Sequence, residues 1–251
     1  MSQHQPNIES LDPNAPRVLG VFLLVHFALV VGIKIKIGQP HDILWMSHVG
    51  LLTTACGFLA RKPALVTAAL IELLVLHSLW LYDCISWMLT GSFPMGLGTY
   101  LINANALVWI ATAHHFYLIP LLVIAVRSRP LHPKEALLIA IATYLFLTCL
   151  CRVFLLPAHN INYAFGVRIA WEHWFWNWAN RNSNGPFYLL GLNAFVTIVM
   201  FLPVYGLVRH WARLQSAHQA NHTTNPRNHI GRSEEESDRC DSIGSSTTCT
   251  T

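Results

Sequence analysis

The stretch that decides the fold is residues 136–156, which read Ala136-Leu-Leu-Ile-Ala-Ile-Ala-Thr-Tyr-Leu-Phe-Leu-Thr-Cys-Leu-Cys-Arg-Val-Phe-Leu-Leu156. Arg152 is its single charged residue. At a rise of about 1.5 Å per residue, a helix of about 20 apolar residues crosses the roughly 30 Å hydrocarbon core of a bilayer. The stretch therefore predicts a membrane-spanning helix.

Similar stretches recur along the chain. Of its 251 residues 53% are hydrophobic and 11% are charged, against roughly 25% charged in an ordinary soluble domain. This composition predicts an all-α, polytopic transmembrane helical bundle over residues 17–208. A polar segment, 1–16, precedes the bundle, and a Ser-, Thr-, Asn- and His-rich cytoplasmic tail, 209–251, is expected to be disordered. The six predicted spans are about 18–33, 40–60, 64–88, 106–126, 136–156 and 187–208.

The orientation follows from the basic residues near the ends of the spans. One side of the membrane receives eight of them and the other receives four, and the richer side is expected to be cytoplasmic. Both termini are then cytoplasmic, and the first span is expected to act as a signal-anchor in a multi-pass protein of the inner membrane. The eight are Arg17, Arg61, Lys62, Arg127, Arg129, Lys134, Arg209 and Arg213, and the four are Lys34, Lys36, Arg168 and Arg181.

Polar residues inside the spans are the main candidates for function, because a charge at the bilayer centre costs roughly 2.5–3.5 kcal/mol on insertion scales. Given the predicted topology, most of them can converge in the outer half of the bundle. His114 and His115 are neighbours about 100° apart on a regular helix, so at most one is expected to face a given site. The candidates within or near the spans are His26, Trp45, His48, Glu72, His77, Asp83, Cys84, His114, His115 and Arg152.

The connection 157–186 adds further candidates. Its first part contains His159, Asn160, Asn162 and Tyr163, which predict a fixed loop over the outer mouth whose Asn side chains bind freed backbone groups or a ligand. Its aromatic run, 171–178, is typical of an interfacial helix at headgroup depth. A purely structural role is the alternative for each of these residues. A lone histidine in a membrane span is more often a packing residue, and Arg152 and Asp83 could form an ion pair that holds two helices together.

Several short motifs also occur in order over roughly residues 40–208. They are Leu44-Trp45-x-x-His48, Tyr82-Asp83, Asn160-Ile-Asn-Tyr-x-Phe-Gly166 and Pro203-x-Tyr205. With them the chain resembles an uncharacterised family of bacterial multi-pass membrane proteins, and its layout is distantly similar to that of YwaF-type proteins. The resemblance implies a six-span inner-membrane protein without implying an activity.

Three functions remain open. The first is a binding or transport site for a lipid headgroup or small solute, formed by Trp45, His48, Asp83, His114, Arg152, His159, Asn160, Asn162 and Tyr163. The second is an intramembrane lipid hydrolase or acyltransferase, with catalytic candidates His48, His77, Asp83, Cys84 and His114. The third is b-type haem ligation by two facing histidines.

Other chemistries lack their motifs. The chain contains no Gly-x-x-x-x-Gly-Lys, His-Glu-x-x-His or Cys-x-x-Cys sequence. His218 and His222 have metal-ligand spacing but stand in the predicted tail without a third ligand. The sequence therefore predicts no metal site and no cofactor. Its expected partners are the lipid bilayer and a lipid or small-molecule ligand, with no nucleic acid because no basic face is present.

Overall fold

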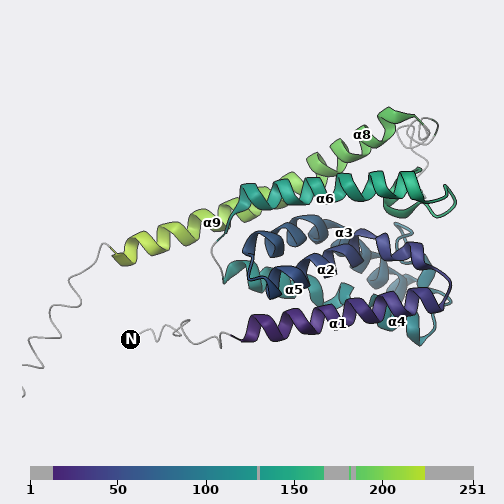
Figure 1. Cartoon of the computed structure of the whole chain (residues 1–251), viewed down its shortest axis with the longest axis horizontal. Coiled ribbons are helices and arrows are strands. Elements are labelled where there is room, and N and C mark those ends of the chain that lie inside the picture. Colours follow the sequence, from purple (N-terminus) through teal and green to yellow (C-terminus); the bar gives the residue numbers. More distant parts are fainter. Residues whose placement is uncertain (1–13, 129–130, 167–180, 182–184, 224–251) are drawn as a thin grey trace, which may run out of the picture. The chain divides into compact units, whose positions relative to one another are not determined.

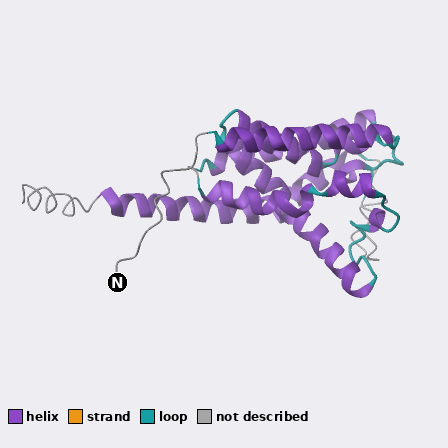
Figure 2. Ribbon diagram, turned by 90° about the horizontal axis from the view of Figure 1, so that it is seen from below, coloured by secondary structure: helices purple, strands orange, loops and turns teal. Residues whose placement is uncertain are grey.

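The computed structural model describes residues 14–128, 131–166, 181 and 185–223. The chain divides into two units, Met1–Arg209 and His210–Thr251, each considered by itself. The described part of the first unit is built of helices and short helical turns, with no strand (Figures 1 and 2). In chain order the elements are α1 Ala15–Lys36, η2 Pro40–Leu44, α2 Met46–Leu59, α3 Pro63–Thr90, η3 Thr99–Leu101, α4 Ala106–Thr112, α5 His114–Arg127, α6 Pro133–Phe154, η4 Ile161–Tyr163, α8 Pro186–Val196, η5 Thr197–Phe201 and α9 Leu202–Thr223.

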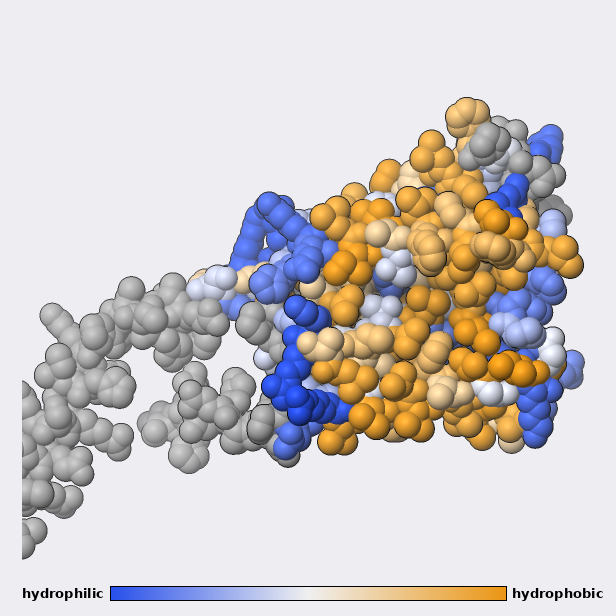
Figure 3. All heavy atoms as spheres, viewed as in Figure 1, coloured by the Kyte–Doolittle hydropathy of each residue, from blue (hydrophilic) through white to orange (hydrophobic). Residues whose placement is uncertain are grey.

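The all-α class is confirmed, and five helical segments are long and apolar enough to cross a membrane. These segments correspond to five of the six predicted spans, although α6 ends at Phe154, two residues before the predicted end of the span 136–156. On the face seen in Figure 3, apolar side chains cover the helices between polar ends, as expected of an integral membrane protein, whose lipid-facing surface is apolar. The five segments are Ala15–Lys36, Pro63–Thr90, Ala106–Arg127, Pro133–Phe154 and Phe187–Ala217.

The predicted span 40–60 differs from the structure. Pro40 begins a 3-10 turn that ends at Leu44, Trp45 adopts an extended backbone (ψ 137°), and the α-helix begins only at Met46. With 14 residues, α2 is about 21 Å long. It is therefore shorter than the hydrocarbon core, and the predicted span 40–60 is not confirmed.

Helix α3 lies at the centre of the bundle and packs against α2, α5 and α6, while α1 covers α2 (Figure 1). Glycines permit the close approach of the first three helices. A Cβ atom on Gly20 of α1 would lie 2.8 Å from Leu59 Cγ, and one on Gly57 of α2 would lie 2.8 Å from Val66 Cγ2. Close backbone approach through small residues is a common way to pack helices in a bilayer, where lipid tails are as apolar as the side chains.

Two of the spans are interrupted. The segment Ala106–Arg127 breaks at Ala113 into α4 and α5. The last span contains the π-helical turn η5, which ends two residues before Pro203, where the missing N–H would disturb a regular helix. Neither interruption is among the expectations from sequence.

The two ends of the bundle differ. We call the end with Arg61, Lys62 and Arg127 the basic end, and the end with η2, the loop 91–98 and η4 the loop end. Helix α9 continues to Thr223, so residues 209–223 of the predicted disordered tail are helical. The rest of that tail, the segment 1–13 and the aromatic run 171–178 lie outside the described residues.

Candidate functional site

The site begins with the break between α4 and α5. Near the break, backbone hydrogen bonds join residues three apart, as in a 3-10 helix, and not four apart, as in an α-helix. Ala113 N–H donates to Ile110 O at 3.2 Å, and Phe116 N–H donates to Ala113 O at 3.1 Å. Phe116 N–H therefore does not donate to Thr112 O, which would be its acceptor in a regular α-helix. A backbone carbonyl left free inside a membrane needs another donor.

Histidine rings donate to the carbonyl groups around the break. His26 Nε2 donates to Ile110 O at 3.2 Å, His114 Nδ1 to Ala111 O at 3.0 Å and His115 Nδ1 to Thr112 O at 3.0 Å. Since a carbonyl only accepts, each of these ring nitrogens carries the hydrogen. Three histidines thus bind three consecutive carbonyls of the break.

His26 is fully committed to this structural task. Its other nitrogen, Nδ1, accepts a hydrogen bond from the Tyr117 hydroxyl. Both ring nitrogens are therefore used within the protein, and no lone pair remains for a ligand. We assign His26 to the support of the break.

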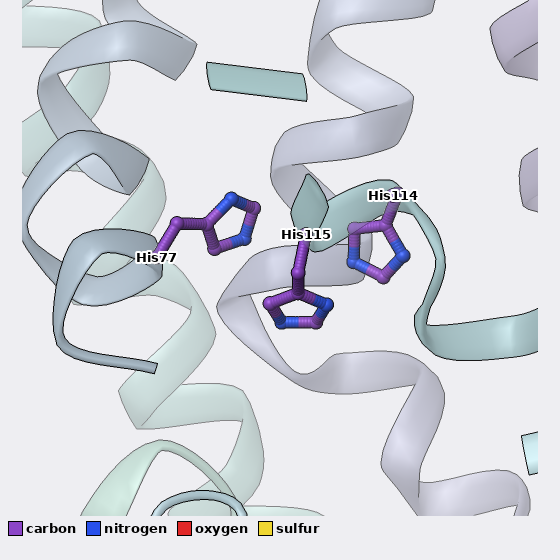
Figure 4. A group of neighbouring side chains, drawn as sticks. All are labelled: His77, His114 and His115. Atoms are coloured by element: carbon purple, nitrogen blue, oxygen red, sulfur yellow. The ribbon is translucent and has the colours of Figure 1, made fainter. Parts of the chain in front are cut away.

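His77, His114 and His115 form the centre of the site, and we call them the histidine triad (Figure 4). His77 comes from the middle of α3, and His115 lies between it and His114, with ring centroids at 4.4 Å and 4.2 Å respectively. All three side chains are buried. One ligand atom of each lies within 4.8 Å of the others.

The protonation pattern leaves lone pairs available in the triad. With Nδ1–H bound to a carbonyl, the neutral rings of His114 and His115 carry their lone pairs on Nε2. His114 Nε2 and both nitrogens of His77 are buried without a hydrogen-bond partner. A histidine whose second nitrogen donates to a carbonyl is the usual form of a metal ligand, because that bond sets the tautomer and the ring orientation.

Imidazole nitrogens suit Zn²⁺, Cu²⁺, Ni²⁺ and iron. A tetrahedral ion with bonds of about 2.0–2.1 Å holds its ligand atoms about 3.4 Å apart, so the nitrogens must approach from the observed limit of 4.8 Å. Three imidazoles that met at such an ion would leave one position of the tetrahedron open.

His48 lies at the edge of the triad. Its ring centroid is 5.3 Å from that of His114, and its Nδ1 donates to Asp42 O at 2.8 Å. The Asp42 carboxylate is in turn bound by Lys34 Nζ at 2.7 Å. The turn η2 thus positions His48 at the start of α2.

Asp83 and Cys84 lie apart from the histidines. The Asp83 carboxylate is buried and accepts from Met95 N–H at 2.7 Å and Gly98 N–H at 2.9 Å, which fixes the loop 91–98. Cys84 packs in an apolar cluster with Trp80 and Leu101. The hydrogen bonds of the described residues join neither of them to a histidine, so the geometry provides no nucleophile–base–orienter set.

A third group of candidates ties η2 to η4 at the loop end. Asn162, in a left-handed conformation (φ 52°), accepts from Met46 N–H at 2.9 Å and donates to Leu44 O at 2.7 Å. Trp45 packs edge-on against Tyr163. The Asn162 side chain therefore forms hydrogen bonds with two backbone groups that have no helical partner because α2 begins only at Met46.

The remaining loop candidates also make internal contacts. Asn160 binds Phe165 N–H at 2.8 Å and Gly166 O at 2.7 Å, and Arg152 donates to Ala164 O at 3.1 Å instead of pairing with Asp83. The ring of His159 lies 3.7 Å from that of His41.

Tyr163 belongs to the same loop. Burial, with a smaller contribution from the Asp83 carboxylate, raises its pKa to about 12 and keeps the phenol neutral. Its backbone carbonyl accepts from the Tyr188 hydroxyl at 2.8 Å.

The predicted site residues thus separate into three groups. His48, His77 and His114 come together near the middle of the bundle, Asp83 and Cys84 adjoin the loop 91–98, and the others hold η2 and η4 at the loop end. His115, which was not among the binding or catalytic candidates, completes the first group. The sequence predicts that at most one of His114 and His115 faces a given site, whereas in the structure both are buried beside His77, with their own ring centroids 4.2 Å apart.

No protein-family model matches the chain, and neither a curated protein nor a solved structure matches it. The resemblance to a bacterial multi-pass family stays a prediction.

Proposed function

We propose that the protein binds a divalent transition-metal ion, Zn²⁺ in the first place, at the histidine triad. The observation that carries the proposal is the convergence of three buried imidazoles whose ligand atoms lie within 4.8 Å of one another. Two of the rings are oriented by backbone carbonyls, and the third, His77, has no other partner for either nitrogen. Buried polar atoms left without a partner are costly, and a metal ion removes that cost.

The open fourth position gives the ion its chemistry. Three neutral ligands do not compensate the charge of a divalent cation, so we expect hydroxide or another anion in this position. Zinc lowers the pKa of bound water to about 7, which makes hydroxide accessible at neutral pH. The three convergent nitrogens favour an ion over haem, which takes two axial histidines.

The wider setting is part of the same proposal. We place the protein in the inner membrane with both termini and the basic end on the cytoplasmic side. The triad then lies near the middle of the bilayer, reached by a small polar solute, here the metal ion. A lipid headgroup bound in the outer half is the competing proposal, and it would depend on residues at the loop end.

Metal binding is tested on the purified full-length protein in detergent. We expect one Zn²⁺ per chain by equilibrium dialysis and, with Co²⁺, the visible absorption of a tetrahedral nitrogen site. His77→Gln and His114→Ala should each weaken binding by about 10-fold to 100-fold or more, as expected for loss of a ligand or its support.

The controls separate the triad from other histidines. His159→Ala, at the loop end, and the double variant His218→Ala/His222→Ala, in the C-terminal segment, should bind Zn²⁺ as the wild type does. Circular dichroism and gel filtration confirm that each variant is folded. A wild type that binds no metal, or a folded His77→Gln that binds it normally, contradicts the proposal.

A further inference from the structure

Glu72 is a buried carboxylate outside the triad. It lies on α3, five residues from His77 toward the basic end, and is 1% exposed. Both of its carboxylate oxygens are without a hydrogen-bond partner. A lone carboxylate inside a bilayer costs several kcal/mol, so such residues usually mark an ion or proton pathway.

The surroundings of Glu72 provide no counter-ion. Helix α3 packs against α2, α5, α6 and η5. Among the described residues no ion pair involves Glu72, and neither carboxylate oxygen has a hydrogen-bond partner. The partner of the carboxylate must therefore be mobile, and the simplest mobile partner is a proton.

Thr67 connects this position with the basic end. It lies a further five residues along α3, is 1% exposed, and its hydroxyl also has no partner. The same residue lines a gap at the basic end, together with Pro63, Val66, Ala125, Val126 and Leu131, which has no room for a water molecule in this structure. Five helical residues correspond to a rise of about 7.5 Å and a net turn of about 140°, so His77, Glu72 and Thr67 are evenly spaced along the axis of α3 but lie on different faces. A proton can therefore reach Glu72 from that end only if the helices move.

The helices around α3 contain the interruptions that movement would need. The α4–α5 break carries two triad histidines, and the π-helical turn η5 contacts both α3 and α6. Interrupted helices beside a midplane site are typical of transporters, where one part of the bundle moves against another. A purely structural metal site requires neither these interruptions nor an unpaired carboxylate.

We propose that Glu72 is a proton-binding site, reached from the basic end past Thr67, and that it couples proton movement to transport of the metal ion bound by the triad. The inference rests on the proposed function. On one side of the membrane the carboxylate accepts a proton from hydronium, whose O–H bond breaks as the carboxyl O–H bond forms. On the other side the carboxyl group gives the proton to water, while the metal ion moves in the opposite direction.

A chemical probe tests the proton site without any metal. Dicyclohexylcarbodiimide partitions into the bilayer and adds across a protonated carboxyl group, giving a stable acylurea. We expect the full-length protein in liposomes to be modified at Glu72, which mass spectrometry of its peptides detects. The Glu72→Gln variant should remain unmodified at this position. Asp83 is the internal control, because two backbone N–H groups bind its carboxylate. An unmodified Glu72 overturns the proposal.

A flux assay tests the coupling. Proteoliposomes carry a zinc indicator and a pH indicator, and Zn²⁺ is added outside. Wild type should admit Zn²⁺ and move protons in the opposite direction. Glu72→Gln should still bind one Zn²⁺ per chain. Both its Zn²⁺ flux and its proton flux should be about 100-fold slower than those of the wild type, which is the smallest effect expected when a positioned proton-transfer group is lost. Thr67→Val, nearly equal in shape, should slow both fluxes and leave binding unchanged.

The outcomes separate the two proposals. If Glu72→Gln carries Zn²⁺ and protons as the wild type does, the role of Glu72 is wrong while the metal site stands. If wild type binds Zn²⁺ but moves no ion, transport is wrong. If wild type binds no metal, the proposed function fails, and the carbodiimide reaction still decides whether Glu72 holds a proton.

Discussion

At the scale of single residues, the histidines perform two tasks that sequence does not distinguish. His26 uses both nitrogens within the protein, whereas His114 and His115 use one nitrogen for the break and keep the other for a ligand. Sequence identified His48, His77 and His114 from their depth in the spans. It does not single out His115, because neighbours on a regular helix lie about 100° apart, and no Gly or Pro between residues 106 and 119 indicates the break.

Asn162 provides a prediction at this scale. Asn162→Ala removes the side-chain hydrogen-bond partners of two backbone groups, Met46 N–H and Leu44 O. Leaving two such groups unsatisfied should lower the free energy of unfolding by about 2–4 kcal/mol. Thermal unfolding in detergent, followed by tryptophan fluorescence, measures the loss.

Asn162→Asp keeps the acceptor for Met46 N–H but places a carboxylate oxygen where the donor to Leu44 O was. Because two acceptors then face each other, we expect a loss of stability at neutral pH at least as large as that of Asn162→Ala, and a smaller loss in acid, where the protonated carboxyl group can donate. A loop that contributes nothing to the start of α2 would leave all three proteins equally stable.

At the scale of elements, close helix contacts and interrupted helices decide the architecture. Gly57 brings α2 against α3, where an added Cβ would meet both Val66 Cγ2 at 2.8 Å and the Val66 backbone nitrogen at 3.0 Å. Sequence located α3 and α6 to within a few residues, because long apolar runs and prolines mark their limits. It missed the late start of α2, because the backbone of η2 is held by Asn162, more than a hundred residues away.

Gly57→Ala tests this contact. A backbone atom cannot rotate away from the new methyl group, so α2 and α3 must separate, and the protein should lose about 1–3 kcal/mol of stability. Gly32→Ala in α1 is the matched control. Its Cβ meets nothing within 4 Å, and alanine favours the helix over glycine by about 1 kcal/mol, so stability should stay equal or rise. Equal melting temperatures for the two variants would argue against a tight contact.

At the scale of the whole molecule, composition was sufficient to predict a helical membrane protein, and the described structure agrees with it. The location of the metal ligands could not be predicted, because it depends on contacts among α3, α4 and α5. At the loop end, Lys34 pairs with Asp42 at 2.7 Å.

Orientation is tested by labelling introduced cysteines in intact cells. Ser92→Cys, in the exposed loop 91–98, should react with a membrane-impermeant maleimide. Ser128→Cys, at the basic end, should react only after permeabilisation. The wild type measures labelling of the native cysteines. The reverse pattern would place the basic end outside, and labelling of both variants in intact cells would exclude an odd number of spans between them, such as the single segment Ala106–Arg127.

The short helix α2 has a consequence for the lipid around the protein. Its length of about 21 Å leaves roughly 9 Å of a 30 Å hydrocarbon core to be matched by the turns η2 and η4. The backbone of these turns is polar, so the surrounding lipid is expected to thin locally at the loop end instead of covering it. Such hydrophobic mismatch costs fractions of a kcal/mol per Å and sorts proteins among membranes of different thickness. The protein should therefore reconstitute more readily, and remain folded longer, in bilayers of short-chain lipids than in thick ones.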